Sequence, residues 1–278
     1  MRLRISHETT FTYDPPASGV IQVLRLTPGN HDGQYVADWN VDLSVDTKLD
    51  MQHDAFGNVT HVFTHVPNGG PLESLTVQVS GLVETQDTGG VLKGTAERFP
   101  PGFFLRSTPL TEASAEMLEL ARALQVEAGG DTLRFLHALM LQIGARMTLT
   151  IDPASIGTTA IEAFESKSGV YQDFAHVFTS CARAVRIPAR YVSGHLFRLN
   201  GAAEPNSGHA WTEAYVPDLG WVGFDPVGGI CTTDAHARVA IGLDYLGAAP
   251  VRGTRYGGGN ETTAVAVTVA QAGRHNNQ

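Results

Sequence analysis

His209 and Asp225 are separated by 16 residues, a spacing that fits two strands joined by a tight turn. Residues 210–216 and 220–224 have strand-like sequences, and residues 217–220 (Pro-Asp-Leu-Gly) form a turn signal between them. Such a hairpin brings the two side chains within hydrogen-bond reach if both face the same side. A histidine oriented by a carboxylate can accept a proton from a nucleophile and return it to a leaving group.

Residues 169–176 (Gly-Val-Tyr-Gln-Asp-Phe-Ala-His) lie at the start of a predicted helix. The helix runs from about Tyr171, places Phe174 and Phe178 on one apolar face, and is stopped by Pro188. A helix N-terminus presents unpaired N–H groups and favours negative charge, so a thiolate nucleophile is stabilised there. This helix start is therefore the second region where chemistry is expected.

Three stretches, in their order along the chain, resemble the signature of the transglutaminase-like family: residues 169–176, 208–215 and 220–226. Residues 187–194 resemble the family's strand after the central helix, and residues 1–85 resemble the sandwich that precedes this core in a bacterial branch. The resemblance implies an α+β fold. It consists of an N-terminal antiparallel β-sandwich and a papain-like core, in which a central helix packs on an antiparallel sheet.

The resemblance also implies the roles of the site residues. His209 is the expected base, and Asp225 is expected to orient it and to stabilise its cation. Family members of this kind hydrolyse or rearrange peptide and isopeptide bonds by Cys-His-Asp acyl transfer, without a cofactor. The expected partner is therefore a peptide or protein that carries an amide. Where the family places its cysteine, this chain has Tyr171.

Neither cysteine of the chain is expected to replace the missing nucleophile. Cys181 lies ten residues further along the same helix, about 15 Å away, on the apolar face. Cys231 follows Asp225 by six residues and approaches the site only if that loop folds back. A free phenol has a pKa near 10, so about a thousandth of Tyr171 is ionised at pH 7. We therefore predict a protein without thiol-type acyl transfer.

Two other functions remain open at this point. The first is a non-catalytic module that binds a peptide or protein in the same cleft. The second is hydrolysis by water that His209 activates, with a rate that follows the histidine titration.

Several residues near the motifs are expected to line the cleft or to support the structure. Gln172 is expected in the substrate cleft, and Trp211 and Trp221 as aromatics of the cleft wall or the core. Asp173 is expected to serve the start of the helix electrostatically, and His176 is expected to be structural.

A metal site is not expected. A metal held by His209, Asp225 and His176 is conceivable, but no ligand spacing supports it. Three further histidines, in or beside predicted strands, are expected to be polar positions on a half-solvated sheet: His53, His61 and His65.

The first part of the chain alternates with period two. Apolar and polar residues alternate over residues 2–13, and the same pattern recurs over 39–45 and 75–79. Turn signals separate these runs, among them Asp-Pro-Pro at residues 14–16. An antiparallel sheet or sandwich over residues 1–85 is therefore predicted.

The pattern becomes helical near residue 108. Thr111 is predicted to begin a helix that ends before Gly129, and Asp131 is predicted to cap a second one. Thr159 and Glu162 form a capping-box pattern at the start of a third helix.

Strands, then helices, then strands indicate two domains. The predicted boundaries are 1–85 for the sandwich, 86–107 for a linker, 108–270 for the core and 271–278 for a tail.

Composition and charge limit the partners and the location that we expect for this protein. The chain has 278 residues, 42% of them hydrophobic, and a net charge of −9, without a Lys/Arg cluster. Nucleic acid and anionic membranes are therefore not expected as partners. The first residues lack the apolar region of a signal peptide, and no run reaches the roughly 20 apolar residues of a membrane span. A cytoplasmic location is the expectation.

Overall fold

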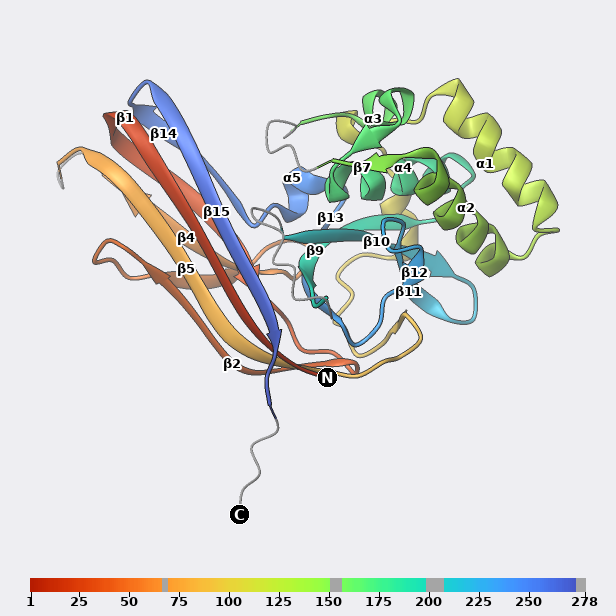
Figure 1. Ribbon diagram of the computed structural model, residues 1–278, viewed down its shortest axis with the longest axis horizontal. Helices are drawn as coiled ribbons and strands as arrows, with labels where there is room; N and C mark the ends of the chain where they lie inside the picture. Colours follow the sequence, from red (N-terminus) through yellow and green to blue (C-terminus); the bar gives the residue numbers. More distant parts are fainter. Residues whose placement is uncertain (67–69, 151–156, 199–207, 274–278) are drawn as a thin grey trace, which may run out of the picture.

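The computed structural model describes residues 1–66, 70–150, 157–198 and 208–273 (Figure 1). The strands are β1 (Arg2–Thr27), β2 (Gln34–Leu43), β3 (Asp50–His53), β4 (Val59–His65), β5 (Leu72–Thr85), β6 (Val91–Leu92), β7 (Thr148–Leu149), β8 (Ser168–Gly169), β9 (Ala189–Leu196), β10 (His209–Val216), β11 (Gly220–Asp225), β12 (Ile230–Cys231), β13 (His236–Gly242), β14 (Val251–Gly257) and β15 (Asn260–Gln271). The α-helices are α1 (Ala115–Glu127), α2 (Thr132–Arg146), α3 (Ala160–Ser166), α4 (Tyr171–Ala184) and α5 (Tyr245–Ala248).

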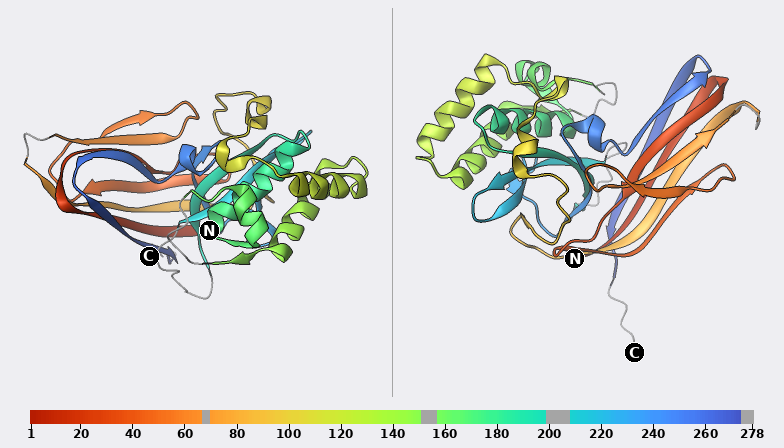
Figure 2. Two further views of the ribbon diagram at one scale, coloured as in Figure 1. Left: turned by 90° about the horizontal axis from the view of Figure 1, so that it is seen from above. Right: turned by 180° about the vertical axis from the view of Figure 1, so that it is seen from behind.

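The N-terminal sheet is built around β1. Its first half pairs with β5 on one edge and β15 on the other, and its second half pairs with β4 and β14, all antiparallel. β2 extends the sheet beyond β5, and β3 extends it beyond β4. Both halves of β1 contribute to one hydrophobic cluster, which includes Phe11, Val20, Leu24, Phe63 and Leu75. The predicted antiparallel sandwich is therefore confirmed (Figures 1 and 2).

β1 does not end where the sequence pattern predicted. The Asp-Pro-Pro run at residues 14–16 lies inside the strand, which continues to Thr27. The register with β5 shifts between Thr12 and Ala17, so the prolines occupy an irregularity in the ladder. Because the regular pairing is already interrupted there, the missing N–H groups of proline are tolerated.

The C-terminal strands belong to the N-terminal sheet. The prediction placed residues 251–270 in the core, but β14 and β15 pair with β1, with Thr9 opposite Val265. Alternation identified residues 265–269 as a strand and gave no information about the sheet it joins, because period two looks the same in either sheet. The core therefore ends near α5, and the chain returns to complete the sandwich (Figure 1).

The predicted linker, residues 86–107, is an ordered part of the core. β6 pairs with β11, and a 3-10 helix spans Pro101–Leu105. Phe104 in that helix is buried and packs edge-to-face on Trp221, with ring centroids 5.2 Å apart.

The core has an antiparallel sheet in the order β12-β11-β10-β9-β13, with β6 also on β11. Asp131 caps α2, and Thr159 and Glu162 form the predicted capping box of α3. α1 begins later than predicted, after the cap Ser114, because Thr111 ends a 3-10 helix over Pro109–Thr111.

The helix α4 crosses this sheet and is buried along nearly all of its length. Phe178 of α4 stacks on Phe224 of β11, with ring centroids 5.5 Å apart. The helices α1 and α2 flank α4 on the side away from the sandwich (Figure 2). Among the described residues, no helix is long and apolar enough to span a membrane.

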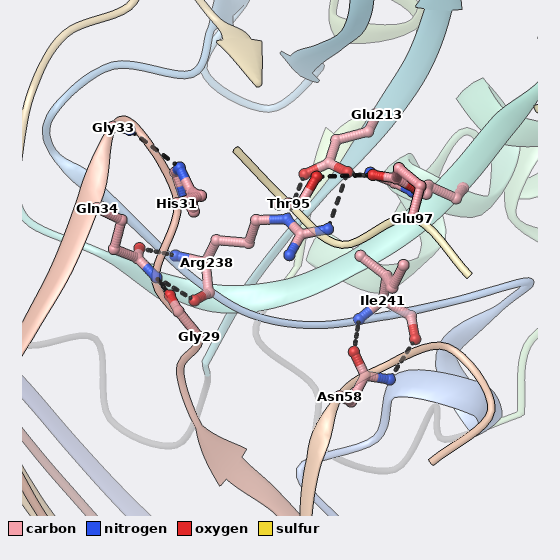
Figure 3. A network of polar contacts seen from close by, with 11 residues as sticks. Gly29, His31, Gly33, Gln34, Asn58, Thr95, Glu97, Glu213, Arg238 and Ile241 are labelled. Atoms are coloured by element: carbon pink, nitrogen blue, oxygen red, sulfur yellow. Dashed lines mark hydrogen bonds and ion pairs between the residues drawn. The ribbon is translucent and has the colours of Figure 1, made fainter. Parts of the chain in front are cut away.

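Side-chain amides join the sandwich to the core (Figure 3). Gln34 accepts a hydrogen bond from the N–H of Arg238 at 2.7 Å and donates to its carbonyl at 2.8 Å. Asn58 makes the same pair of bonds with the backbone of Ile241, both at 2.8 Å. Because each amide satisfies one N–H and one carbonyl of β13, these contacts hold the core strand against the start of β2 and the loop between β3 and β4.

Candidate functional site

Tyr171 is the first residue of α4. The preceding Val170 is extended, and its N–H donates to Oδ2 of Asp173 at 2.8 Å. Gly169 is required before it, because a Cβ there would lie 2.6 Å from the same oxygen. Burial raises the pKa of Asp173 to about 6, although the hydrogen bond from Val170 works in the opposite direction. Asp173 thus serves the start of the helix, the role expected from the sequence.

His209 and Asp225 form a hydrogen-bonded pair. β10 and β11 are adjacent, with Thr212 opposite Phe224, which brings the beginning of one strand beside the end of the other. Nε2 of His209 lies 2.7 Å from Oδ2 of Asp225, and both side chains are buried. The hairpin geometry that the 16-residue spacing predicted is therefore present.

Asp225 is held as a carboxylate by four donors. Its Oδ1 accepts the N–H groups of Val227 and Gly228, at 3.0 and 3.1 Å. Its Oδ2 accepts from His209 and, at 3.4 Å, from Nε2 of His236. Burial alone raises the pKa of Asp225, but the two histidines outweigh it and hold the pKa well below the usual range. An ionised carboxylate only accepts, so Nε2 of His209 carries the proton.

His236 was missed by the sequence analysis. Nδ1 of His236 accepts the N–H of Thr233 at 3.1 Å, so its proton is on Nε2 and points to Asp225. A single histidine eleven residues after Asp225 carried no motif, and only the position of β13 beside β9 brings it to the site.

His209 has a second ring nitrogen, Nδ1, which Asp225 does not contact. This nitrogen is buried and has no hydrogen-bond partner among the described residues. In a neutral imidazole whose proton is on Nε2, Nδ1 carries a lone pair. The ring of Tyr171 stands edge-on to the imidazole, with centroids 4.7 Å apart, and Tyr171 is only 4% exposed. Arg198, a further residue that the sequence analysis missed, donates from Nη2 to the Tyr171 hydroxyl at 2.8 Å.

Both cysteines face other parts of the core. Cys181 is buried, its Sγ donates to the carbonyl of Met117 at 3.8 Å, and burial raises its pKa to about 12. Cys231 pairs with Phe224, the neighbour of Asp225, and so belongs to the opposite face of the sheet. Its Sγ lies 4.0 Å from Nε2 of His137, and burial raises its pKa.

The residues expected in the cleft separate into two groups. Gln172 lines a cavity of about 910 Å³ together with Tyr171 and His209. Trp211 and Trp221 do not line this cavity. They pack in a buried aromatic cluster with Phe104, so the prediction that they lie in the substrate cleft is wrong for this cavity, and they belong to the core.

His176 does not join the site as a metal ligand. Its Nε2 accepts the N–H of Tyr245 at 2.9 Å. The described side chains that could hold a metal are instead His209, Asp225 and His236, whose donor atoms lie within 4.8 Å of one another. Nε2 of His236 is protonated, because Nδ1 accepts from Thr233. That nitrogen has no lone pair to offer a metal. The three side chains are therefore better described as a hydrogen-bonded cluster, in which both histidines donate to Asp225, than as a metal site.

The burial of His176 predicts a pH dependence of stability. Burial lowers its pKa in the folded chain to about 4, against about 6.5 when unfolded. The unfolded chain therefore binds a proton that the folded chain does not, and this part of the stability, complete above pH 6.5, is lost as the pH falls toward 4. His176→Gln should lose less free energy of unfolding between pH 7 and pH 4.5 than the wild type. Urea unfolding at both pH values measures this, and equal losses would contradict it.

Comparisons with known proteins agree with this architecture. The model of the bacterial transglutaminase-like N-terminal region matches residues 3–84, and that of the transglutaminase-like superfamily matches residues 119–226. An uncharacterized protein of Mycobacterium leprae is 28% identical, and the alignment covers 97% of this chain and 99% of that protein.

One sequence and one solved structure also match, and they differ in how much of this chain the match covers. A protein-glutamine gamma-glutamyltransferase of Pseudomonas aeruginosa is 30% identical over 39% of this chain and 18% of its own length. The crystal structure of a candidate cysteine protease from Cytophaga hutchinsonii has a TM-score of 0.76. It is 18% identical, and the match covers 99% of this chain and 91% of that one. Residues 119–226, which form the helix-on-sheet core, therefore belong to the transglutaminase-like superfamily, and residues 3–84 of the sandwich match the N-terminal region of its bacterial branch.

Proposed function

We propose that this protein binds an amide-bearing ligand beside His209 and does not carry out acyl transfer through a thiol. The observation that carries the proposal is the position of Tyr171. It occupies the first residue of α4 and stands 4.7 Å, centroid to centroid, from the imidazole that Asp225 orients. By the family resemblance, this is the place of the nucleophilic cysteine.

The chemistry of the phenol supports this proposal. Thiol enzymes depend on the thiolate, which a helix N-terminus and a neighbouring histidine stabilise. The Tyr171 side chain offers no sulfur, and its hydroxyl accepts a hydrogen bond from Arg198. Cys181 and Cys231 contact Met117 and His137 instead. The imidazole and carboxylate thus remain in place without a thiol to activate.

The cavity supports binding. Its volume of about 910 Å³ is within the range of small-molecule and cofactor sites, and it reaches from Tyr171 and His209 to β1 of the sandwich. Amide groups are the ligand chemistry that the family resemblance implies. The protein-glutamine gamma-glutamyltransferase of P. aeruginosa, which matches part of the core, is named for protein glutamine, a residue whose side chain is an amide.

Hydrolysis by water is a second candidate function. The observation that favours it is that Nδ1 of His209 has no hydrogen-bond partner among the described residues, while Asp225 orients the ring through Nε2. This nitrogen could take a proton from a water molecule.

A turnover assay tests the proposal. Wild type, Cys181→Ser/Cys231→Ser and His209→Ala are incubated with glutamine-containing peptides and acyl p-nitroanilides, and ammonia and nitroaniline are measured. We expect all three to remain at the buffer rate. Turnover that the double cysteine variant loses would contradict the proposal by showing a thiol route. Turnover that survives in that variant and disappears in His209→Ala would replace it with the water route.

A further inference from the structure

The cavity beside His209 continues into the sandwich. Its lining includes His7, Thr9, Phe11 and Tyr13, alternate residues of β1 that share one face. The ring of His7 contacts the ring of His195, with centroids 5.6 Å apart. His195 is next in sequence to Gly194, which pairs with His209 across β9 and β10. From His7 to Tyr13 the strand rises about 20 Å, at about 3.3 Å per residue. The cavity therefore extends from His209 along β1 to Tyr13, and we refer to this part of it as the channel.

Unpaired polar atoms gather along this channel. Among the described residues, most of the buried side-chain atoms without a hydrogen-bond partner belong to its lining. Nδ1 of His7, Oε1 of Gln22 and the hydroxyl of Tyr13 are examples, and each of these residues is at most 5% exposed. Buried polar groups normally have partners, because leaving them unpaired costs free energy. Their concentration on one channel indicates that a ligand supplies the partners.

The charge of the lining favours an uncharged ligand. Burial lowers the pKa of His7 to about 4 and that of His195 to about 3, so both are neutral at pH 7. Three arginines line the cavity. Arg25 is paired with Asp54 at 2.9 Å, and Arg252 is exposed to solvent and donates to the carbonyl of Leu246 at 3.1 Å. Arg255 lies 3.5 Å from Glu261, so its charge is also compensated.

Apolar residues alternate with the polar ones. Phe11 lies between Thr9 and Tyr13 on the same face of β1, and Val265 of β15, opposite Thr9, also lines the channel. A ligand that fits must present hydrogen-bonding groups at intervals and apolar groups between them. An extended peptide has this pattern, and about six residues span the 20 Å from His7 to Tyr13.

We propose that the channel between His209 and Tyr13 binds an uncharged, extended peptide segment of about six residues, whose amides pair with Gln22, Tyr13 and the imidazoles. This inference rests on the proposed function, since it specifies the amide ligand of the same site. It assigns to the sandwich a direct part in binding, in addition to its contacts with the core.

Calorimetric titration with the capped hexapeptide acetyl-(Ala-Gln)₃-amide tests the inference. Wild type is expected to bind it, and the tripeptide acetyl-Ala-Gln-Ala-amide is expected to bind at least tenfold more weakly. Tyr13→Phe and Gln22→Leu, which each remove one hydrogen-bonding group, should each weaken hexapeptide binding about fivefold. The matched controls are Tyr35→Phe and Gln52→Leu, which make the same changes at exposed positions and should leave binding unchanged.

Stability measurements distinguish a binding role from a structural one. Tyr13→Phe removes a buried hydroxyl without a partner, so the melting temperature of the free protein should stay the same or rise while peptide affinity falls. The channel is refuted if the hexapeptide does not bind wild type, if it binds no better than the tripeptide, or if the Tyr13 and Gln22 variants bind it as well as their controls. None of these results restores thiol turnover, so the proposed absence of acyl transfer is judged separately by the turnover assay.

Discussion

Tyr171→Cys is expected to produce a thiol that iodoacetamide alkylates at pH 7 about tenfold faster than a free cysteine. The new sulfur would stand at the first residue of α4, where the helix N-terminus favours a thiolate, and beside the unpaired Nδ1 of His209. A free cysteine is only a few per cent thiolate at pH 7, so a lowered pKa raises the reactive fraction. The measurement is the rate of alkylation, with the labelled residue identified by peptide mass mapping.

Two comparisons make this result specific. Tyr171→Cys/His209→Ala keeps the helix N-terminus and removes the imidazole, so the rate should fall toward that of a free cysteine. Cys181 and Cys231, whose pKa values burial raises, should label slowly in every variant. Replacing a buried aromatic ring leaves a cavity and costs about 3–5 kcal/mol, so circular dichroism must show that the variant is folded at the assay temperature. A folded variant whose introduced thiol labels no faster than free cysteine would contradict the placement of the site.

Glu213→Gln is expected to lower the free energy of unfolding by about 3–5 kcal/mol. Glu213 is 3% exposed and lies between two guanidinium groups, with Arg190 Nε at 2.6 Å and Arg238 Nε at 2.7 Å. Figure 3 shows its contact with Arg238. Arg190 is fully buried, and Glu97 remains as its second partner. The substitution therefore leaves buried positive charge only partly compensated. Urea unfolding at pH 7 measures the loss.

The matched control is Glu84→Gln, which breaks the exposed pair with Arg2 at 3.4 Å. Exposed pairs contribute about 0–1 kcal/mol, so its effect should be small. Burial raises the pKa of Glu213, but Arg238 and Arg190 outweigh burial and lower it to about 2. Its stabilising effect is therefore complete above the unfolded pKa near 4.5 and is lost as the pH falls toward 2. Equal losses in the two variants would refute the buried network.

Much of the fold could be predicted from local signals. The helix α4, the cap Asp131 and the capping box of Thr159 and Glu162 depend on neighbouring residues, and the structure has them. The position of β14 and β15 depends on contacts between the two ends of the chain, which no local pattern contains. The length of β1 was underestimated because the prolines at residues 14–16 indicate a turn unless the partner strands show an irregularity there.

The contacts of the candidate site likewise fall into those that local sequence predicts and those that depend on distant segments. The hydrogen bond between His209 and Asp225 followed from one hairpin, whose spacing is visible in the sequence. His236 and Arg198 reach the site from separate segments and carry no motif of their own. The tryptophans Trp211 and Trp221 show the reverse case. Their closeness to the motifs suggested the cleft wall as well as the core, and packing with Phe104 placed them in the core.

The rate of ammonia release from a glutamine-containing peptide, measured side by side for wild type and Tyr171→Cys, tests the central claim most directly. We predict that wild type stays at the buffer rate and that the cysteine variant exceeds it. A wild-type rate that equals or surpasses that of the variant would contradict the claim that the phenol has replaced the working nucleophile.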